Sequence, residues 1–394
     1  MAVRILKPPT HTGAFLEATG PLADFGTKAG LLPCQRIKAV IAHRKLVQAA
    51  PDIEESQIQP ASLDLRLGAR AYRVRASFLP GRAKTVQEQL EALSYDEINL
   101  EHGAVLEKGC VYVVELLEHL NLPESISALA NPKSSTGRLD IFTRLIADYS
   151  DVFDSVHGRY EGKLYAEISP CSFSIRVRKG SRLNQMRFRR RHPKQSENQK
   201  FSLTDRELME RHETQPLVDG ELVLRNGVVL SVDLAGEGGN LIGYRAQRYS
   251  GVIDVDEVGR YDWRDFWEPM RPRADRRLIL DPHQFYILAS RERVQIPRDL
   301  AAEMIPIDPM MGEFRVHYAG FFDPGFGMTE SGQPGARAVL EVRSHEVPFV
   351  LEHGQAVGRL DYEELAEPPD VLYGQGKTSN YQHQGLKLSK HFRA

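Results

Sequence analysis

The sequence predicts a mainly β protein built from two tandem copies of one domain, with a few short helices. Three observations lead to this prediction. The chain has 394 residues, which is too long for one ordinary domain and comfortable for two. Several segments alternate apolar and polar residues with the period of a β-strand. The third observation is an internal repeat whose length matches a whole domain rather than a short solenoid unit.

The internal repeat is found by shifting the chain 174 residues against itself. Identical residues then meet in one register: Leu106 with Leu280, Tyr112 with Tyr286, Glu118 with Glu292, Pro123 with Pro297, Ala128 with Ala302, Pro132 with Pro306, Glu167 with Glu341, and Gly180 with Gly354. Chance does not maintain a register over this length, so we infer a duplicated domain. We expect an N-terminal arm at 1–30, a first domain at 31–194, a second domain at 195–370 and a C-terminal arm at 371–394.

Individual elements follow from local patterns. Ile37, Val40 and Val47 have helical spacing, so a short amphipathic helix is expected over residues 35–49. Residues 202–205 (S-L-T-D) have the form of a capping box that opens another helix. Half-buried or buried strands are expected at 62–68, 111–117, 173–177 and 221–234, and a polar linker between the domains at 189–198.

Composition and charge exclude several classes of function. The chain is 41% hydrophobic, as is typical of a globular protein. Its formal net charge of -2 gives no overall electrostatic attraction to nucleic acids or membranes. No apolar run approaches a membrane span, and the N-terminus lacks the apolar core of a signal peptide, so we expect a cytoplasmic protein. Cys34, Cys110 and Cys171 are far apart and form no CxxC pair, which indicates neither a disulfide framework nor a cysteine-rich zinc site.

Three segments carry candidate chemistry. Residues 131–138 (N-P-K-S-S-T-G-R) combine hydroxyls, a glycine and two cations, which suit a phosphate, although such turns are also common on surfaces. Residues 322–327 (F-D-P-G-F-G) are typical of a tight turn between strands. Glu341 lies in an apolar strand. A buried carboxylate there would suit general acid–base catalysis, whereas strand alternation would equally well point it at solvent.

The sequence lacks the motifs of several other known classes of enzyme. There is no H-x-E with a downstream P-C-x-x-C, as in zinc deaminases, and no Walker or Rossmann glycine pattern. The thirteen histidines form no metal-ligand spacing. The basic runs at 187–194 and 271–277 lack interleaved aromatic residues, so we interpret them as solvated surface rather than as a nucleic-acid site.

As a set, these segments resemble the dCTP deaminase and dUTPase superfamily, and among its members the long two-domain bacterial deaminases. The resemblance covers most of residues 30–390, in family order. Its segments are 59–68 (the first strand), 133–138 (the phosphate-binding S-S-x-x-R), 319–326 (the A-G-x-x-D-P-G-[FW] loop), 339–341 (the catalytic strand), 354–360 (the G-x-x-I-G-Q-L strand) and 381–385 (the arm that folds over the nucleotide). The fold it implies is two dUTPase-like β-domains.

The resemblance also implies catalytic roles. Glu341 would activate a water that attacks C4 of cytosine and would relay the proton so that ammonia leaves, with no metal on the water. Ser134 and Arg138 would hold the water, the base and the glutamate in place. The strand backbone beside the glutamate, at Val339 and Leu340, would bind the pyrimidine edge.

Binding of the rest of the nucleotide is implied in the same way. Asp323 would contact the deoxyribose, and Lys133, Ser134 and Ser135 would bind phosphates. Magnesium would arrive on the triphosphate, and no zinc is expected. Further contacts would come from the C-terminal arm, at Tyr373 and Gln384. Asn380 stands where the family arm usually has a lysine, so a phosphate contact there would require Lys377 to take the role of that lysine.

The two copies depart from the family pattern in complementary ways. The first keeps 133–138 and Glu167 but has D-V-F-D at 151–154, where D-P-G-[FW] belongs. The second keeps that loop and Glu341 but has P-M-M-G-E-F-R at 309–315, in place of S-S-x-x-R. Because family sites lie between neighbouring domains, we expect one composite site made of half of each copy.

The implied activity is deamination of dCTP to dUTP and ammonia in pyrimidine deoxynucleotide synthesis, with dTTP as a candidate feedback inhibitor. Two alternatives remain: a dUTP diphosphatase, alone or combined with deamination, and a non-catalytic nucleotide-sensing protein. The glutamate favours deamination, because dUTPases typically carry an aspartate near that position. A homo-oligomer is expected, and neither a nucleic-acid nor a membrane partner is.

Overall fold

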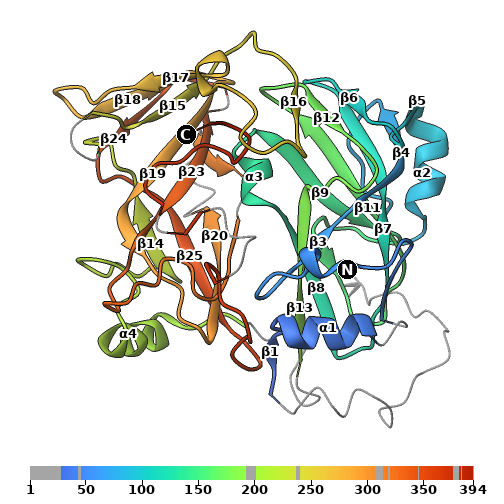
Figure 1. The fold of residues 1–394 in the computed structure, drawn as a ribbon, viewed down its shortest axis with the longest axis horizontal. Helices are drawn as coiled ribbons and strands as arrows, with labels where there is room; N and C mark the ends of the chain where they lie inside the picture. The colour runs from blue at the N-terminus through green and yellow to red at the C-terminus, as the bar shows by residue number, and fades with distance from the viewer. Residues whose placement is uncertain are drawn as a thin grey trace, which may run out of the picture.

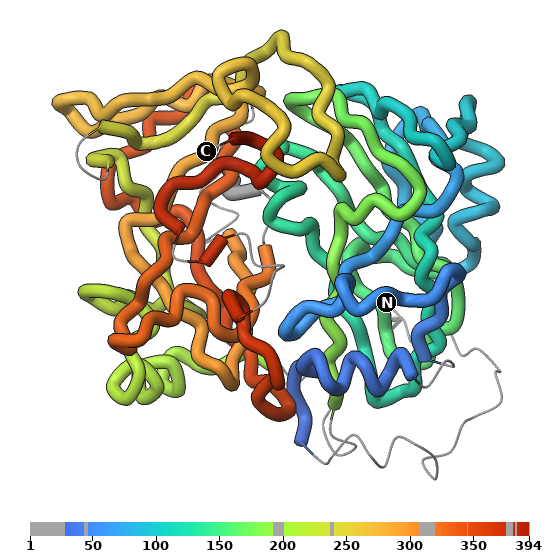
Figure 2. Tube along the Cα trace, viewed as in Figure 1, coloured from blue at the N-terminus to red at the C-terminus, as the bar shows by residue number. Residues whose placement is uncertain are grey.

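The chain forms two β-rich halves that lie side by side (Figure 1), which confirms the predicted mainly β fold. The computed structural model describes residues 28–42, 46–191, 201–236, 240–306, 314–317, 320–344, 346–375, 381–382 and 384–393. Figure 2 shows the C-terminal segment crossing from the second half toward the first, next to α3 (Ser134–Gly137). None of the helices within these ranges has both the length and the apolar character needed to cross a membrane.

The first half is built around two sheets with short helices at their edges. One sheet has the order β1-β13-β8-β10, with β3 also paired to β13, and the other has the order β5-β4-β7-β11-β9, with β2 also paired to β7. The helical elements are α1 (Cys34–Ala42), η2 (Glu55–Gln57), α2 (Val86–Leu93) and α3. The strands are β1 (Gly30–Leu31), β2 (Val47–Ala49), β3 (Leu63–Leu65), β4 (Leu67–Val74), β5 (Ser94–Asn99), β6 (Ala104–Leu106), β7 (Val111–Asn121), β8 (Ile126–Pro132), β9 (Ile141–Ala147), β10 (Ser155–Val156), β11 (Glu161–Pro170), β12 (Ile175–Val177) and β13 (Asn184–Arg190).

The second half repeats this plan. Its sheets have the orders β14-β25-β20-β22, β17-β15-β19-β23-β21 and β18-β24. Its helical elements are α4 (Asp205–Thr214) and η4 (Trp263–Asp265). Its strands are β14 (Val228–Ser231), β15 (Gly243–Ala246), β16 (Ile253–Asp254), β17 (Trp267–Met270), β18 (Arg277–Leu280), β19 (Phe285–Val294), β20 (Leu300–Pro306), β21 (Phe314–His317), β22 (Phe321–Phe322), β23 (Ala336–Ser344), β24 (Phe349–Glu352) and β25 (Ala356–Glu364).

The strand pairings support the inferred duplication. The β7-β11-β9 run of the first half corresponds to β19-β23-β21 of the second, and the β13-β8 pair corresponds to β25-β20. The small β12-β6 pair likewise corresponds to β24-β18. Strands that recur at the same offset in sequence also occupy the same places in their sheets.

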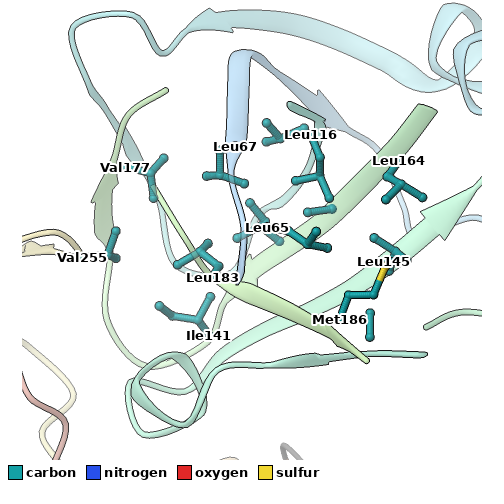
Figure 3. Close-up of a cluster of buried hydrophobic side chains, with 14 of the residues drawn as sticks. Leu65, Leu67, Leu116, Ile141, Leu145, Leu164, Val177, Leu183, Met186 and Val255 are labelled. Carbon is teal, nitrogen blue, oxygen red and sulfur yellow. The ribbon is translucent and has the colours of Figure 1, made fainter. Parts of the chain in front are cut away.

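The two halves share a hydrophobic core. The strand β16 of the second half pairs in parallel with β12 of the first. Phe173 of the first half makes edge-to-face ring contacts with Phe266 and Trp267, and Trp267 makes another with Phe392 of the C-terminal arm. Figure 3 shows Val255, also from the second half, at the edge of a cluster formed by buried side chains of the first. Burial of these side chains therefore stabilises the association of the halves.

Several local expectations were wrong where long-range contacts decide the structure. The expected helix over 35–49 ends at Ala42, because Val47–Ala49 instead pairs with β7 as β2. The expected half-buried strand at 62–68 is interrupted at Arg66, and its polar side chains are buried as well. Arg66 donates a 2.8 Å hydrogen bond to Glu118, which satisfies both charges in the core.

The segment that joins the halves also differs from its expectation. The expected linker at 189–198 begins too early, because Arg189 and Arg190 belong to β13; residues 192–200 lie outside the described ranges. The capping box exists, but Thr204 and Glu207 form it. Of the strand expected at 221–234, only Val228–Ser231 is present.

Candidate functional site

The turn at residues 131–138 lies at the boundary between the two halves, where Figure 1 shows α3. The backbone amide of Lys133 and the hydroxyl of Thr136 both donate 2.9 Å hydrogen bonds to the carbonyl oxygen of Leu183. These bonds hold the turn against the start of β13. Ser134 and Arg138 therefore reach a cavity that the second half completes.

Arg138 fastens the C-terminal arm over this cavity. Its side chain is only 3% exposed. Nη1 donates to the carbonyl oxygen of Lys387 and Nη2 to Oε1 of Gln384, each at 2.9 Å. The guanidinium also stacks on Tyr381, 3.9 Å from the ring centroid. Nε makes no hydrogen bond within the described residues and lies 3.9 Å from Oε1 of Glu341.

Glu341 presents a buried carboxyl group to the cavity. It lies in β23, opposite Ile287 of β19, and is 6% exposed. Burial raises the pKa of Glu341 to about 8, although the nearby Arg138 guanidinium acts in the opposite direction. The 3.9 Å separation from Arg138 is too long for a direct hydrogen bond. A carboxyl group with a pKa near neutrality can both accept and return a proton.

Asp323 lies on the loop after β22 and is held from the first half. Its Oδ1 accepts a 3.0 Å hydrogen bond from Nη2 of Arg187, a residue of β13. Burial raises the pKa of Asp323, and Arg187 opposes this shift. Arg187 belongs to a basic run that was expected to be solvated, and this expectation is wrong, since its side chain is 3% exposed. The run at 271–277 does have exposed arginines, as expected.

A small cavity lies between the two halves. Both copies contribute walls: Ser134 and Arg138 from the first, and Asp323, Val339 and Glu341 from the second. The remaining lining residues are Met304, Gly320, Phe321, Phe322, Phe326, Tyr373, Tyr381 and Gln384. The structure thus brings the two retained half-sites together in one cavity.

A wider groove continues from the cavity and carries several cations. Lys133, which is half-buried, forms an ion pair with the buried Asp64, and Arg182 donates a 2.7 Å hydrogen bond to Glu54. Lys390 of the C-terminal arm lies here with no ion-pair partner in the described part of the chain. Burial lowers the pKa of Lys390, and the neighbouring Lys133 adds to this effect. A cation in such surroundings suits an anionic ligand.

The remaining predicted residues are placed as follows. Ser135 lines the groove, and its carbonyl oxygen accepts a 2.8 Å hydrogen bond from Ser389 of the arm. Tyr373 lines both the cavity and the groove. The side chain of Leu340 does not line the cavity but is buried in the second core. Lys377 and Asn380 lie outside the described residues, as does most of the segment 309–315.

The equivalent glutamate of the first copy is engaged differently. Arg144 donates a 2.6 Å hydrogen bond to Oε1 of Glu167. The Arg144 guanidinium also stacks on Phe153, 3.5 Å from the ring centroid, in the segment that replaces the family loop. Arg144 therefore covers Glu167, whereas Glu341 faces open space.

Two site residues were not found by sequence reasoning. Arg187 sits between the buried residues Met186 and Phe188, so strand alternation alone points it away from the first core. It is buried only because the second half covers that face. Lys390 has no local signal beyond its place in the C-terminal arm. As for metals, no group of three or more His, Cys, Asp or Glu side chains within the described ranges is arranged to hold an ion.

The fold and the site together define a class of protein: a pair of tandem dUTPase-like β-domains with a cavity between them. Family models give the particular assignment. Residues 28–192 match the 2'-deoxycytidine 5'-triphosphate deaminase N-terminal domain, and residues 204–392 match the C-terminal domain. The chain belongs to the 2'-deoxycytidine 5'-triphosphate deaminase family, which confirms the resemblance.

Individual relatives agree with this family. The crystal structure of 2'-deoxycytidine 5'-triphosphate deaminase from Agrobacterium tumefaciens has 53% sequence identity and a TM-score of 0.81, covering 86% of this chain and 99% of that one. A Halobacterium salinarum protein named "dCTP deaminase, dUMP-forming" is 34% identical over 27% of this chain and 52% of its own length. A probable deoxyuridine 5'-triphosphate nucleotidohydrolase of Methanopyrus kandleri is 38% identical over 22% and 53%. This chain therefore spans about half the length of these two curated relatives.

Proposed function

We propose that this protein deaminates dCTP, converting it with one water to dUTP and ammonia. The observation that carries the proposal is the position of Glu341. A buried carboxyl group with a pKa of about 8 lines the cavity between the halves, and a guanidinium from the other half lies 3.9 Å away. Acid–base catalysis at neutral pH requires a group that can exist in both protonation states.

In the proposed reaction, ionised Glu341 takes a proton from the water as its oxygen attacks C4 of cytosine. The C4–N bond then breaks, and the amino group leaves as ammonia. One water proton ends on the ammonia and the other on N3 of the uracil product. Arg138 and Ser134 orient the glutamate and the water, so geometry supplies part of the rate. No metal activates the water in this scheme.

The groove is the proposed site of the triphosphate. Lys133, Ser134 and Ser135 would bind phosphate oxygens, and Lys390 adds a cation from the arm. Magnesium would enter as part of the nucleotide. Asp323 would contact the deoxyribose at the junction of cavity and groove. A pyrimidine triphosphate such as dTTP would fit the same surfaces, which supports its proposed role as an inhibitor.

A second candidate function is deamination combined with diphosphate removal. The observation that favours it is the name of the relatives, several of which are called dUMP-forming. The nucleotidohydrolase relative points in the same direction. In that case the same site would release dUMP and pyrophosphate.

One assay separates these functions. Purified protein is incubated with magnesium and either dCTP, dCMP, deoxycytidine or dUTP, and ammonia, pyrophosphate and nucleotide products are measured. We expect ammonia from dCTP much faster than from dCMP or deoxycytidine. Pyrophosphate released with the ammonia would establish the combined activity. Equal rates on the free nucleoside would contradict the triphosphate site, and dCTP binding without any ammonia would indicate a nucleotide sensor.

A further inference from the structure

Arg187 is an unusually buried arginine whose observed side-chain hydrogen bonds all go to the other half of the molecule. It lies in β13, and its side chain is 3% exposed. Arginine is rarely this buried unless its charge and donors are matched. The acceptors of the Arg187 side chain therefore indicate which groups it holds in place.

The Arg187 guanidinium binds the loop that carries Asp323 at several points. Nη1 donates to the carbonyl oxygen of Ala302 at 2.9 Å, and Nη2 donates to the carbonyl oxygen of Phe322 at 2.9 Å. Nη2 also donates to Oδ1 of Asp323 at 3.0 Å. The guanidinium plane stacks on Phe321, 4.1 Å from the ring centroid. A planar fork can satisfy such a set of contacts, whereas the point charge of a lysine cannot.

Asp323 is left with one carboxylate oxygen for a ligand. Among the described residues, Arg187 donates to Oδ1, and none donates to Oδ2. Asp323 lines both the cavity and the groove, which is where a sugar between base and phosphates would lie. A 2'-deoxyribose joined to phosphate at its 5' position has only its 3'-hydroxyl free to donate.

We propose that Arg187 is a positioning residue for the deoxyribose: it holds Oδ1 of Asp323 so that Oδ2 accepts a hydrogen bond from the 3'-hydroxyl. The proposal rests on the proposed function, because it assumes a deoxycytidine nucleotide in the cavity. It assigns sugar recognition to a residue of the first half acting through a residue of the second.

The charges around Asp323 support this role. Arg187 and Lys133 are the cations that act on the Asp323 carboxyl group, and Asp64 is the like charge. Burial raises the pKa of Asp323, so removal of Arg187 would favour the protonated form. Arg187 thus orients the Asp323 acceptor and favours its ionised form.

The test compares dCTP with 2',3'-dideoxycytidine triphosphate, which lacks the 3'-hydroxyl. Arg187→Ala should raise the KM for dCTP about 10- to 100-fold, the effect of losing a hydrogen bond to a charged group. It should leave kcat largely unchanged, because the sugar contact is the same in the ground and transition states. For the dideoxy nucleotide the KM of wild type is already high, and Arg187→Ala should not raise it further.

Two further variants make the comparison secure. Arg189→Ala is the matched control: Arg189 lies on the same strand and bonds Glu363 across the halves at 2.9 Å, away from the cavity. It should leave both KM values unchanged. Arg187→Lys retains the charge and should lose part of the preference for dCTP; it replaces Arg187→Ala if the alanine variant does not fold.

An equal rise of KM for both nucleotides would overturn the proposal, because it would show a general scaffolding role. No rise for either nucleotide, or no preference for dCTP in wild type, would overturn it as well. If wild type releases no ammonia from dCTP, the deaminase proposal fails separately. The same comparison is then made with equilibrium Kd values for the two nucleotides, and the same outcomes decide it.

Discussion

Replacement of Glu341 by glutamine tests the site through two independent properties. Glu341→Gln preserves the shape of the side chain and removes the base. We expect kcat for ammonia release from dCTP to fall by roughly 10²- to 10⁴-fold, the usual contribution of a positioned acid or base. Glu167→Gln is the matched variant, since Glu167 occupies the same strand position in the first copy. It should retain most of the activity, because Arg144 already covers that carboxylate.

The second property is the pH dependence of stability. The pKa of Glu341 is about 8 in the folded protein, against a usual value of 4.5. Because burial raises this pKa, the contribution to stability is fully present below pH 4.5 and is lost as pH rises to about 8. At about 1.4 kcal/mol for each tenfold change, the whole loss is on the order of 5 kcal/mol. Glutamine cannot ionise, so the variant escapes this loss.

Denaturant titrations of both proteins at several pH values measure this effect. The free energy of unfolding of Glu341→Gln, minus that of wild type, should increase between about pH 5 and pH 8 and level off above. Contributions of all other groups cancel in the difference. In wild type, kcat/KM should rise over the same range as the base ionises. A difference that does not change with pH, or turnover abolished by Glu167→Gln and tolerated in Glu341→Gln, would refute the reasoning.

Three further predictions concern the surroundings of Glu341. Arg138→Ala removes the cation beside Glu341, so kcat should fall by about 10²-fold or more. It also removes both hydrogen bonds to the C-terminal arm, so proteolysis near Tyr381 should accelerate. A near-normal kcat would exclude Arg138 from the site. Lys390→Met should raise the KM for dCTP about tenfold, the loss of a charge-assisted bond, without changing the slow turnover of deoxycytidine; an unchanged KM would remove the groove from phosphate binding. Thorough zinc chelation followed by magnesium should leave circular dichroism and ammonia release intact, whereas stoichiometric bound zinc by mass spectrometry would contradict a metal-free chemical step.

The repeat made much of the fold predictable. Strands β8 and β20, which include Pro132 and Pro306, were already aligned by a single offset in sequence. The offset carries over because a duplicated domain retains the apolar alternation that faces its core. The composite arrangement of the site was predictable for the same reason, since each copy lacked the motif that the other kept. The structure brings Arg138 and Glu341 to one cavity, as that argument expected.

The remaining features depend on contacts that no local pattern records. The apolar and polar residues around Arg66 alternate as in a half-exposed strand. Arg66 is nevertheless buried, because its side chain bonds to Glu118, which lies far along the chain. Arg187 has the sequence environment of a surface cation and is buried by a domain whose placement the sequence does not encode locally. Lys390 becomes part of the groove because Ser389 bonds to Ser135 of α3 and the Tyr381 hydroxyl accepts a hydrogen bond from the Lys390 backbone amide. In each case tertiary structure overrides the local preference.

The shared core has a consequence for how the protein behaves at low concentration. A site assembled from separate subunits disappears when dilution separates them, but here Arg138 and Glu341 are joined by one polypeptide. Each half therefore meets the other at an effective concentration set by the chain and not by the amount of protein present. Separation of the halves would also expose Trp267 and Phe392 to water. The two halves of this cavity consequently remain together at any protein concentration.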